Sequence, residues 1–483
     1  MTASMSASAV SVAAAIAANR FGLGARPGEL EKIGSDARGW LMRQLTGAPP
    51  VLAGEGLHPS AQTLARVIGL RREAMDQRKD QRKAGDEAAA KAAAFKLPSV
   101  YRPIYVDEIA ARFTHAVRTP RPFLERITQF WSNHFAVSID KVVVLGLAGA
   151  MEREAIRPRV LGKFADLLSA VEKHPAMLLY LDNQTSVGPH SRAAELANRR
   201  GAKRKMDINE NLAREILELH TLGVDGGYTQ ADVTTFAHAI SGWSIGGQEL
   251  GRRLEKLGFD NGTPGEFLFR AGFHEPGARR LLGKSYGDDG VKQGEAILRD
   301  LAVSPRTARH IATKLARHFI ADDPPQAAVD RIAKAWLDSH GHLSTVYEAL
   351  VDSPEAWEQP LAKFKTPADY IHSSFRALEM PLREKRRLLQ PFEALGQRSL
   401  MPGSPAGWPD TSADWDGSSA LLKRIAWADV VAQRLGSARS ARELAPQLLG
   451  GALSAQTATA IARAASGAQA LTLLLASPEF MRR

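Results

Sequence analysis

The sequence of 483 residues contains no cysteine. This absence excludes disulfide bonds, thiolate zinc sites, iron–sulfur clusters and cysteine nucleophiles, so any bound metal would need His, Asp or Glu as ligands. Long apolar runs are missing as well, because no run approaches the roughly 18 apolar residues without a charge that a membrane-spanning helix requires. We therefore expect no transmembrane segment. The apolar N-terminal run has no Lys or Arg before it, so no ordinary secretory signal peptide is visible.

Positive charge exceeds negative charge only modestly: 63 Lys and Arg oppose 52 Asp and Glu, which gives a formal net charge of +11. Two segments concentrate charged side chains. Residues 71–97 are rich in Ala and mix both signs, which is typical of an exposed, flexible charged insertion. Residues 184–206 contain a cluster of basic side chains and are interpreted as a basic loop, either simply mobile or facing an anionic ligand. No aromatic platform accompanies the cluster, so specific nucleic-acid binding is not expected.

Apolar residues recur at three- and four-residue spacing along most of the chain, which predicts a mainly α-helical, compact multi-helix body. Residues 1–18 are interpreted as a variable N-terminus, and residues 19–483 are expected to form a single helical domain. Residues 243–275 are the exception: they are rich in Gly and end in alternating aromatics, which favours a short β-hairpin or an irregular insertion. Residues 399–415 hold three Pro and two Trp, which indicates an ordered loop packed on helices.

The strongest candidate for a functional element is the helix predicted for residues 207–223, with Asp207 as its N-cap. Glu215 and Glu218 lie one turn apart on this helix, and Asn211 precedes them on the same stripe. Apolar residues occupy most of the remaining circumference, so the helix is expected to be buried. Burial of two carboxylates is costly unless they are neutralised. Either arginine side chains satisfy them structurally, or the pair holds a metal ion or works as an acid/base pair.

Two further polar residues fall on otherwise apolar segments. His134 continues an aromatic helical stripe that includes Phe130, so it is either a core histidine bonded to a backbone carbonyl or a ligand or general base. Asp182 ends an apolar segment and begins a Gly/Pro loop. At such a position it is either a site residue or the cap of the following turn.

These residues define a hypothetical site of buried Glu, His and Asp side chains. The candidate catalytic residues are Glu215 and His134. The candidate metal ligands are Glu215, Glu218, Asp182 and His134. The candidate substrate-binding residues are Asn133, Asn183, Asn211, Arg214 and His220. A divalent metal ion is one option for the cofactor, whereas haem is not expected.

Seven segments carry a resemblance to a known family: FWSNHFAVS (130–138), HPAMLLYLDNQTSVGP (174–189), NENLAREILELHTLGVDGGYTQADV (209–233), LLGKSY (281–286), IATKLARHFIADDPP (311–325), SPAGWPD (404–410) and SPEFMRR (477–483). From about Asn19 to Arg483 the chain resembles the large bacterial family numbered 1800 among the domains of unknown function. The family has no settled activity, so the resemblance assigns no catalytic residues. Members often resemble secreted or periplasmic proteins encoded beside a sulfatase-like family with a twin-arginine signal. The resemblance therefore implies a location outside the cytoplasm and a sulfatase-like exported partner.

Two functions are consistent with these observations. The first is an extracytoplasmic enzyme, a hydrolase in which a divalent metal ion lowers the pKa of a bound water and a free carboxylate accepts its proton. This hypothesis requires the four candidate metal ligands to converge in one cleft. The second is a non-catalytic helical subunit for binding or assembly, in which the buried polar residues are structural.

Overall fold

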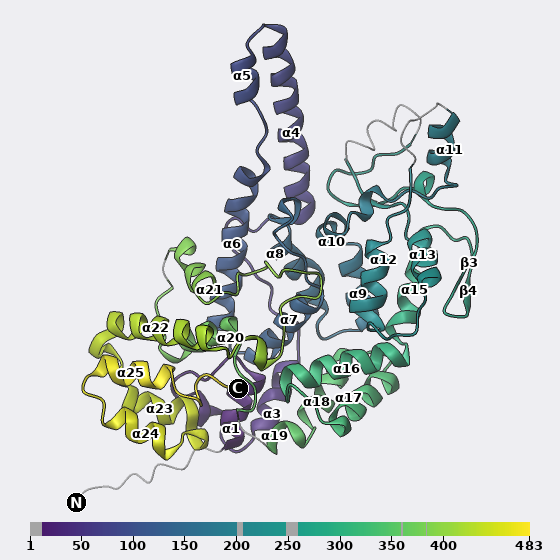
Figure 1. Cartoon of the computed structure of the whole chain (residues 1–483). Helices are drawn as coiled ribbons and strands as arrows, with labels where there is room; N and C mark the ends of the chain where they lie inside the picture. Colours follow the sequence, from purple (N-terminus) through teal and green to yellow (C-terminus); the bar gives the residue numbers. More distant parts are fainter. Residues whose placement is uncertain (1–11, 200–205, 248–258, 359–360, 383) are drawn as a thin grey trace, which may run out of the picture.

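The fold of this protein is mainly α-helical, as predicted, and its two antiparallel strand pairs are short. The computed structural model describes residues 12–199, 206–247, 259–358, 361–382 and 384–483. Helices from all parts of the sequence pack around a large hydrophobic core (Figure 1). Within the described ranges, no helix combines the length and the apolar character that are needed to cross a membrane.

Two long helices form an arm that stands out from the body of the molecule (Figure 1). They are α4 (Ser60–Lys83) and α6 (Leu97–Arg118), and the short α5 (Glu87–Ala92) lies between them at the tip. The charged segment 71–97 forms the outer part of this arm, and most of its side chains are exposed. Charges of both signs are tolerated there because the outer helices face water on most of their circumference.

The centre of the body is α7 (Pro122–His134), which starts with Pro in its first turn and is buried on nearly every side. Its apolar residues include Phe130 and Trp131, and the indole Nε1 of Trp131 donates to Tyr347 Oη at 2.6 Å. A buried indole with a hydrogen-bond partner costs little and fixes the helix in the core. Four short helices from the N-terminal part complete this region: α1 (Val12–Ile16), α2 (Glu29–Ile33), α3 (Ala37–Met42) and α8 (Ala148–Met151).

One side of the body carries both strand pairs. The strands are β1 (Trp243–Ile245), β2 (Phe267–Phe269), β3 (Arg279–Leu281) and β4 (Lys284–Tyr286). β1 pairs with β2 in the register Trp243 to Phe269, so residues 243–275 contain the predicted hairpin, although residues 248–258 lie outside the described chain. The helices on this side are α9 (Phe164–Glu172), α10 (Pro175–Tyr180), α11 (Arg192–Arg199), α12 (Asn211–Glu215), α13 (Gln230–Ala239) and α15 (Val291–Ala302).

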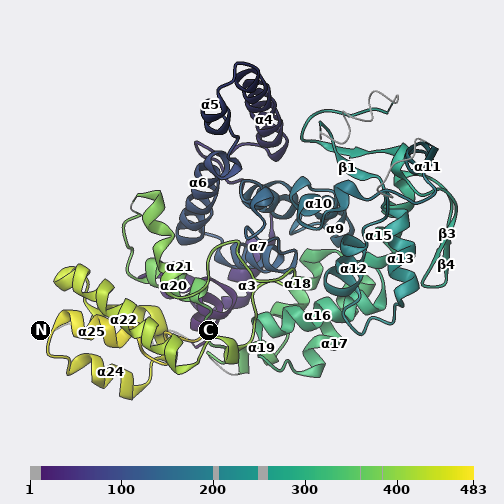
Figure 2. The ribbon, with the colours of Figure 1, turned by 45° about the horizontal axis from the view of Figure 1, so that its top comes forward.

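The remaining helices form two groups. The first contains α16 (Pro305–Phe319), α17 (Gln326–Asp338), α18 (Leu343–Val351) and α19 (Glu355–Glu358). The second contains α20 (Pro367–Ala377), α21 (Gln390–Ala394), α22 (Ser418–Leu435), α23 (Ala441–Leu449), α24 (Ala455–Ala462) and α25 (Gly467–Leu475). Figure 2 shows α22, α24 and α25 at one end of the molecule and α11 and α13 at the other, with α7 between them.

Among the described residues, three segments adopt π-helical hydrogen bonding, which is rare and recurs at functional sites. They are η1 (Ala17–Phe21), η4 (Glu152–Ile156) and η7 (Ile216–Thr221). The last one occupies the second half of the helix predicted for residues 207–223. That helix begins at Asn211 rather than directly after Asp207. Its N-cap is Glu210, which forms no side-chain capping bond, and the Asn209 side chain accepts the N–H of Asn211 at 2.9 Å.

Candidate functional site

The two carboxylates of the predicted site lie on consecutive elements: Glu215 is the last residue of α12, and Glu218 belongs to η7. Burial raises the pKa of Glu215 above its ordinary value, and the charge of His220 opposes this effect while that of Glu218 adds to it. Arg214 does not pair with either carboxylate, because its Nη2 atom lies 3.1 Å from Glu210 Oε2. Glu215 is therefore a half-buried carboxylate with a raised proton affinity.

His220 and His134 lie next to each other in the core, and each is 1% exposed. Nδ1 of His220 lies 2.8 Å from Glu172 Oε1, and the two imidazole ring centroids are 6.0 Å apart. Nε2 of His134 lies 3.2 Å from the carbonyl oxygen of His220, which is the backbone bond of a core histidine. Burial, and then the charge of Lys314, lowers the pKa of His134 well below its ordinary value. The His134 ring is therefore neutral at physiological pH.

The other predicted site residues have partners of their own. Asp182, in a left-handed backbone conformation, lies 2.6 Å from Lys141 Nζ. Asn183 is buried, and its Nδ2 donates to the carbonyl of Trp243 at 3.0 Å. Asn211 is exposed. Across the described part of the chain, no group of three or more His, Asp or Glu side chains is arranged to hold a metal ion.

The basic loop at 184–206 is described only in part. Its residues Arg200, Lys203, Arg204 and Lys205 lie outside the described residues. Arg192 stacks over the ring of Phe259 at 5.4 Å. Arg199 forms an exposed ion pair with Glu195, which lies one helical turn before it. The Nη2 atom of Arg199 is 3.8 Å from a carboxylate oxygen of Glu195.

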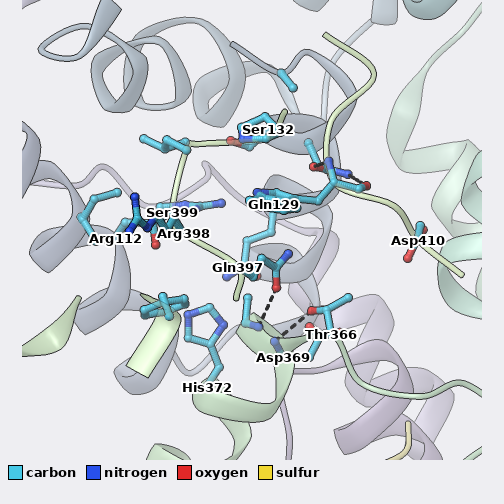
Figure 3. A pocket seen from close by; sticks show the side chains of 18 of the residues that line it. Arg112, Gln129, Ser132, Thr366, Asp369, His372, Gln397, Arg398, Ser399 and Asp410 are labelled. Carbon is cyan, nitrogen blue, oxygen red and sulfur yellow. Dashed lines mark hydrogen bonds between the residues drawn. The ribbon is translucent and has the colours of Figure 1, made fainter. Parts of the chain in front are cut away.

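A cavity of about 110 Å³ lies beside α7, between α6, α20 and the loop 399–415 (Figure 3). We call it the main cavity. Its charged and titratable lining residues are Arg112, Arg126, His318, Asp369, His372, Arg398 and Asp410. Figure 3 shows Arg112 and Asp410 toward opposite sides of the cavity, with Gln129 and Gln397 between them. The main cavity is thus formed by side chains of both charge signs from segments far apart in the sequence.

A histidine and an aspartate are paired at one side of the main cavity. Nδ1 of His318, from α16, lies 2.8 Å from Oδ2 of Asp410, and the two side chains are 14% and 24% exposed. Burial lowers the pKa of His318 to about 4, against the opposing charge of Asp410. Burial would raise the pKa of Asp410, but His318 and the cations Lys363 and Arg483 hold it well below its ordinary value. At neutral pH the pair is therefore an uncharged imidazole that donates from Nδ1 to a carboxylate.

Asp369 joins two buried arginines beside the cavity. Its Oδ1 lies 3.0 Å from Arg126 Nη1, and its Oδ2 lies 3.0 Å from Arg483 Nε. Burial would raise the pKa of Asp369, but these two guanidinium groups hold it well below its ordinary value. Nε of Arg126 also donates to the carbonyl of Gly22 at 2.6 Å. The guanidinium of Arg126 is therefore held in place before any ligand binds.

Arg112 enters the cavity wall from α6 and is held by a chain of alternating charges. Its Nε lies 2.7 Å from Oε2 of Glu152, a residue of η4 that is 2% exposed. Oε1 of Glu152 accepts from Arg157 at 2.8 Å, and Arg157 pairs in turn with Glu125. These buried partners fix the direction of the Arg112 side chain.

A second pocket, of about 270 Å³, shares a wall with the main cavity. The residues that line both are Asn133, His318, Trp408, Pro409 and Asp410. The second pocket is lined further by His134, Lys314 and Arg317, and we call it the Lys314 pocket. Asn133 and His134, two of the candidate site residues singled out from the sequence, thus line the Lys314 pocket. The other candidate site residues line neither the main cavity nor the Lys314 pocket.

The sequence did not single out His318, Asp369, His372 or Asp410. No local spacing joins them, because they lie on α16, on α20 and in the loop 399–415 and meet only in the folded chain. One signal was present nevertheless. His318 and Asp410 lie within IATKLARHFIADDPP and SPAGWPD, two of the segments that carry the family resemblance.

Comparison with known protein families identifies a matching family. A family model described as a protein of unknown function (DUF1800) matches residues 16–482, a range that includes every lining residue of both pockets. Neither the curated proteins nor the solved structures contain a match to the chain. Because the family model spans almost the whole sequence, the chain belongs to the DUF1800 family.

Proposed function

We propose that the protein is a hydrolase whose active site is the main cavity and whose general base is His318. The observation that carries this proposal is the pairing of His318 with Asp410 beside the cavity. Because Asp410 accepts the Nδ1 proton, the lone pair of Nε2 remains available. Nε2 is buried, and no hydrogen-bond partner for it occurs among the described residues. A histidine oriented by a carboxylate in this way is suited to take a proton from water or a hydroxyl.

In the proposed reaction, Nε2 of His318 accepts a proton from a water molecule in the cavity while the water oxygen attacks an electrophilic centre of the substrate. The bond between that centre and the leaving group then breaks, and His318 returns the proton to the leaving group. The imidazolium that forms is stabilised by Asp410, which stays ionised. Arg126 and Arg112 are already fixed by buried partners, so they stabilise the negative charge that develops on the substrate without first reorganising. The family resemblance supports a location of this activity outside the cytoplasm.

The test is hydrolysis of a panel of chromogenic esters, amides, glycosides and phosphate esters by the wild type and by His318→Gln and Asp410→Asn. Loss of the general base is expected to lower kcat by about 10²–10⁴-fold for any substrate that the wild type hydrolyses. The matched control is His342→Gln, at an exposed histidine. Circular dichroism establishes that each variant is folded. Unchanged hydrolysis by folded His318→Gln contradicts the proposal.

A second function, a subunit for binding or assembly, is supported by the arm formed by α4, α5 and α6. The arm stands out from the body and exposes its charged side chains, as a docking element would (Figure 1). On this proposal, replacement of residues 72–95 by a short Gly/Ser turn abolishes binding to the purified sulfatase-like protein that the family resemblance implies as partner. His318→Gln leaves that binding unchanged, so the two proposed functions predict opposite results for the two variants.

A further inference from the structure

The Lys314 pocket contains cations that the protein does not neutralise. Lys314 and Arg317 lie one turn apart on α16, and both side chains are partly buried. In the described part of the chain neither forms an ion pair; Arg317 Nε donates only to the backbone carbonyl of Asp322, at 3.2 Å. A third cation on the same helix, Arg309, is paired with Asp330 on the surface. Arg306, the fourth cation of the helix, does not line the pocket and donates to the backbone carbonyl of Gly226.

Burial makes this arrangement costly for the isolated protein. It lowers the pKa of Lys314 to about 8, with the charge of Asp410 opposing the effect and that of Arg317 adding to it. An ammonium group in partly desolvated surroundings gains from a nearby negative charge, because the interaction is screened less than at the surface. An anion in the pocket would supply that charge.

Other residues that line the pocket are suited to the remainder of an organic ligand. Phe130 and Trp408 provide apolar surface. His134 provides a polar atom, because its Nδ1 is buried and has no hydrogen-bond partner in the described chain. The one carboxylate without a cation partner that lines the pocket, Asp414, is exposed and accepts a hydrogen bond from Thr411. Asp410, the other carboxylate that lines the pocket, is paired with His318 and lies near Lys363 and Arg483. Lys314 and Arg317 are thus the lining cations for which the described chain provides no ion-pair partner.

We propose that the Lys314 pocket binds the oxyanion of a small organic acid between Lys314 and Arg317, so that the substrate of the main cavity is an anionic molecule. As a statement about a substrate, this inference rests on the proposed function. The inference is based on the wall that the two pockets share, because Asn133, His318 and Asp410 line both pockets. A molecule whose charged group lies at Lys314 would present its neighbouring atoms to His318.

The oxyanion can be a carboxylate or a phosphate, and two probes separate them. Isothermal titration calorimetry of the full chain with sodium acetate and with sodium phosphate at neutral pH is expected to show binding of one probe with a Kd of about 1 mM or below. Lys314→Gln and Arg317→Gln should each weaken this binding about tenfold or more, because each removes a charge-assisted contact. Arg309→Gln, on the same helix, should leave it unchanged. Absence of binding by both probes, or equal binding by all variants, overturns the proposal.

A second measurement does not depend on the folding of the variants. Limited acetylation of the wild-type chain, followed by mass spectrometry, should modify Lys314 and the exposed Lys334, and the binding anion should protect only Lys314. Equal modification of Lys314 with and without the anion contradicts the site. Neither measurement uses turnover. If anion binding depends on Lys314 but His318→Gln retains full hydrolysis, the pocket assignment stands and the proposed function fails.

Discussion

The side-chain amide of Asn133 pairs with the backbone of Trp408 as one peptide group pairs with another. Nδ2 of Asn133 donates to the Trp408 carbonyl at 2.9 Å, and Oδ1 of Asn133 accepts the Trp408 N–H at 2.8 Å. The close approach requires Gly407, whose φ is +84° and where an added Cβ would lie 2.3 Å from the backbone oxygen of Asn133. These two hydrogen bonds hold the segment that carries Asp410 against α7.

Asn133→Asp is expected to loosen that segment. The substitution replaces a donor by a carboxylate oxygen that faces the Trp408 carbonyl, so one hydrogen bond is exchanged for a repulsion. A loss of about 1–3 kcal/mol in the free energy of unfolding follows for a partly buried bond of this kind. Urea denaturation measures it, with Asn211→Asp at an exposed position as the control. Equal stability of the two variants would show that the amide pair does not anchor the segment.

Asp369→Asn is expected to be among the most damaging single changes. It leaves Arg126 and Arg483, both buried, without their shared carboxylate. Removal of one partner from a buried ion pair costs about 3–5 kcal/mol. The control is Asp330→Asn, which breaks the exposed pair with Arg309 and should cost less than about 1 kcal/mol. Urea denaturation measures the free energy of unfolding of both variants. Similar losses for Asp369→Asn and Asp330→Asn would contradict the expectation.

The stability of the protein should fall as the solution becomes acidic, in part because of His372. This residue is buried between the rings of Phe113 and Phe392, with ring centroids 5.5 and 5.8 Å away. Burial, and then the charge of Arg112, lowers the pKa of His372 to about 3. The unfolded chain therefore binds a proton at this histidine at a pH where the folded chain does not. Stability from the neutral ring is present above the unfolded pKa and is lost as the pH falls toward the folded pKa.

We therefore expect His372→Gln to reduce the loss of unfolding free energy between about pH 7 and pH 5 by about 2 kcal/mol. Urea denaturation at the two pH values measures the difference. His342→Gln, at an exposed histidine, should leave the pH dependence of the wild type unchanged. A His372→Gln protein with the full wild-type slope would mean that the unfolded and folded chains protonate at this histidine alike.

Glu215 provides a test of the metal site suggested by the sequence. Asp182 pairs with Lys141, and His134 bonds a backbone carbonyl, so two of the four candidate ligands already have protein partners. We expect plasma mass spectrometry of protein purified without chelators to find the same metal content in wild type and Glu215→Gln. Stoichiometric metal that is lost in the variant would instead establish the carboxylate helix as a metal centre.

Much of the fold could be predicted from apolar spacing, and particular elements show why. The alternating aromatics before Phe269 indicated a hairpin, which the pairing of β1 with β2 confirms. The helix of residues 207–223 was predicted as one regular element, because periodicity does not distinguish a π-helical turn from an α-helical one. The N-cap predicted at Asp207 was wrong, because the helix begins at Asn211 with Glu210 as its N-cap.

The candidate site was less accessible to sequence reasoning. His134 was found because it continues an aromatic stripe on one helix, which is a local signal, and Asn133 precedes it in the same segment. His318 and Asp410 are polar residues on separate elements, and their pairing is created by the packing of α16 against the loop 399–415. Arg112 and Arg126 look like ordinary helix residues, since their buried partners come from other segments.

The wall shared by the two pockets also has a consequence for the order of folding. It joins Asn133 to Trp408, which are 275 residues apart in the chain. Contacts across such a distance form late, because the entropy of closing the intervening loop must be overcome before they provide any stabilisation. During refolding, helical content should therefore return before either pocket exists. A newly made chain would remain unable to bind or convert a ligand until the segment 404–410 has docked, whatever fraction of its helices is already formed.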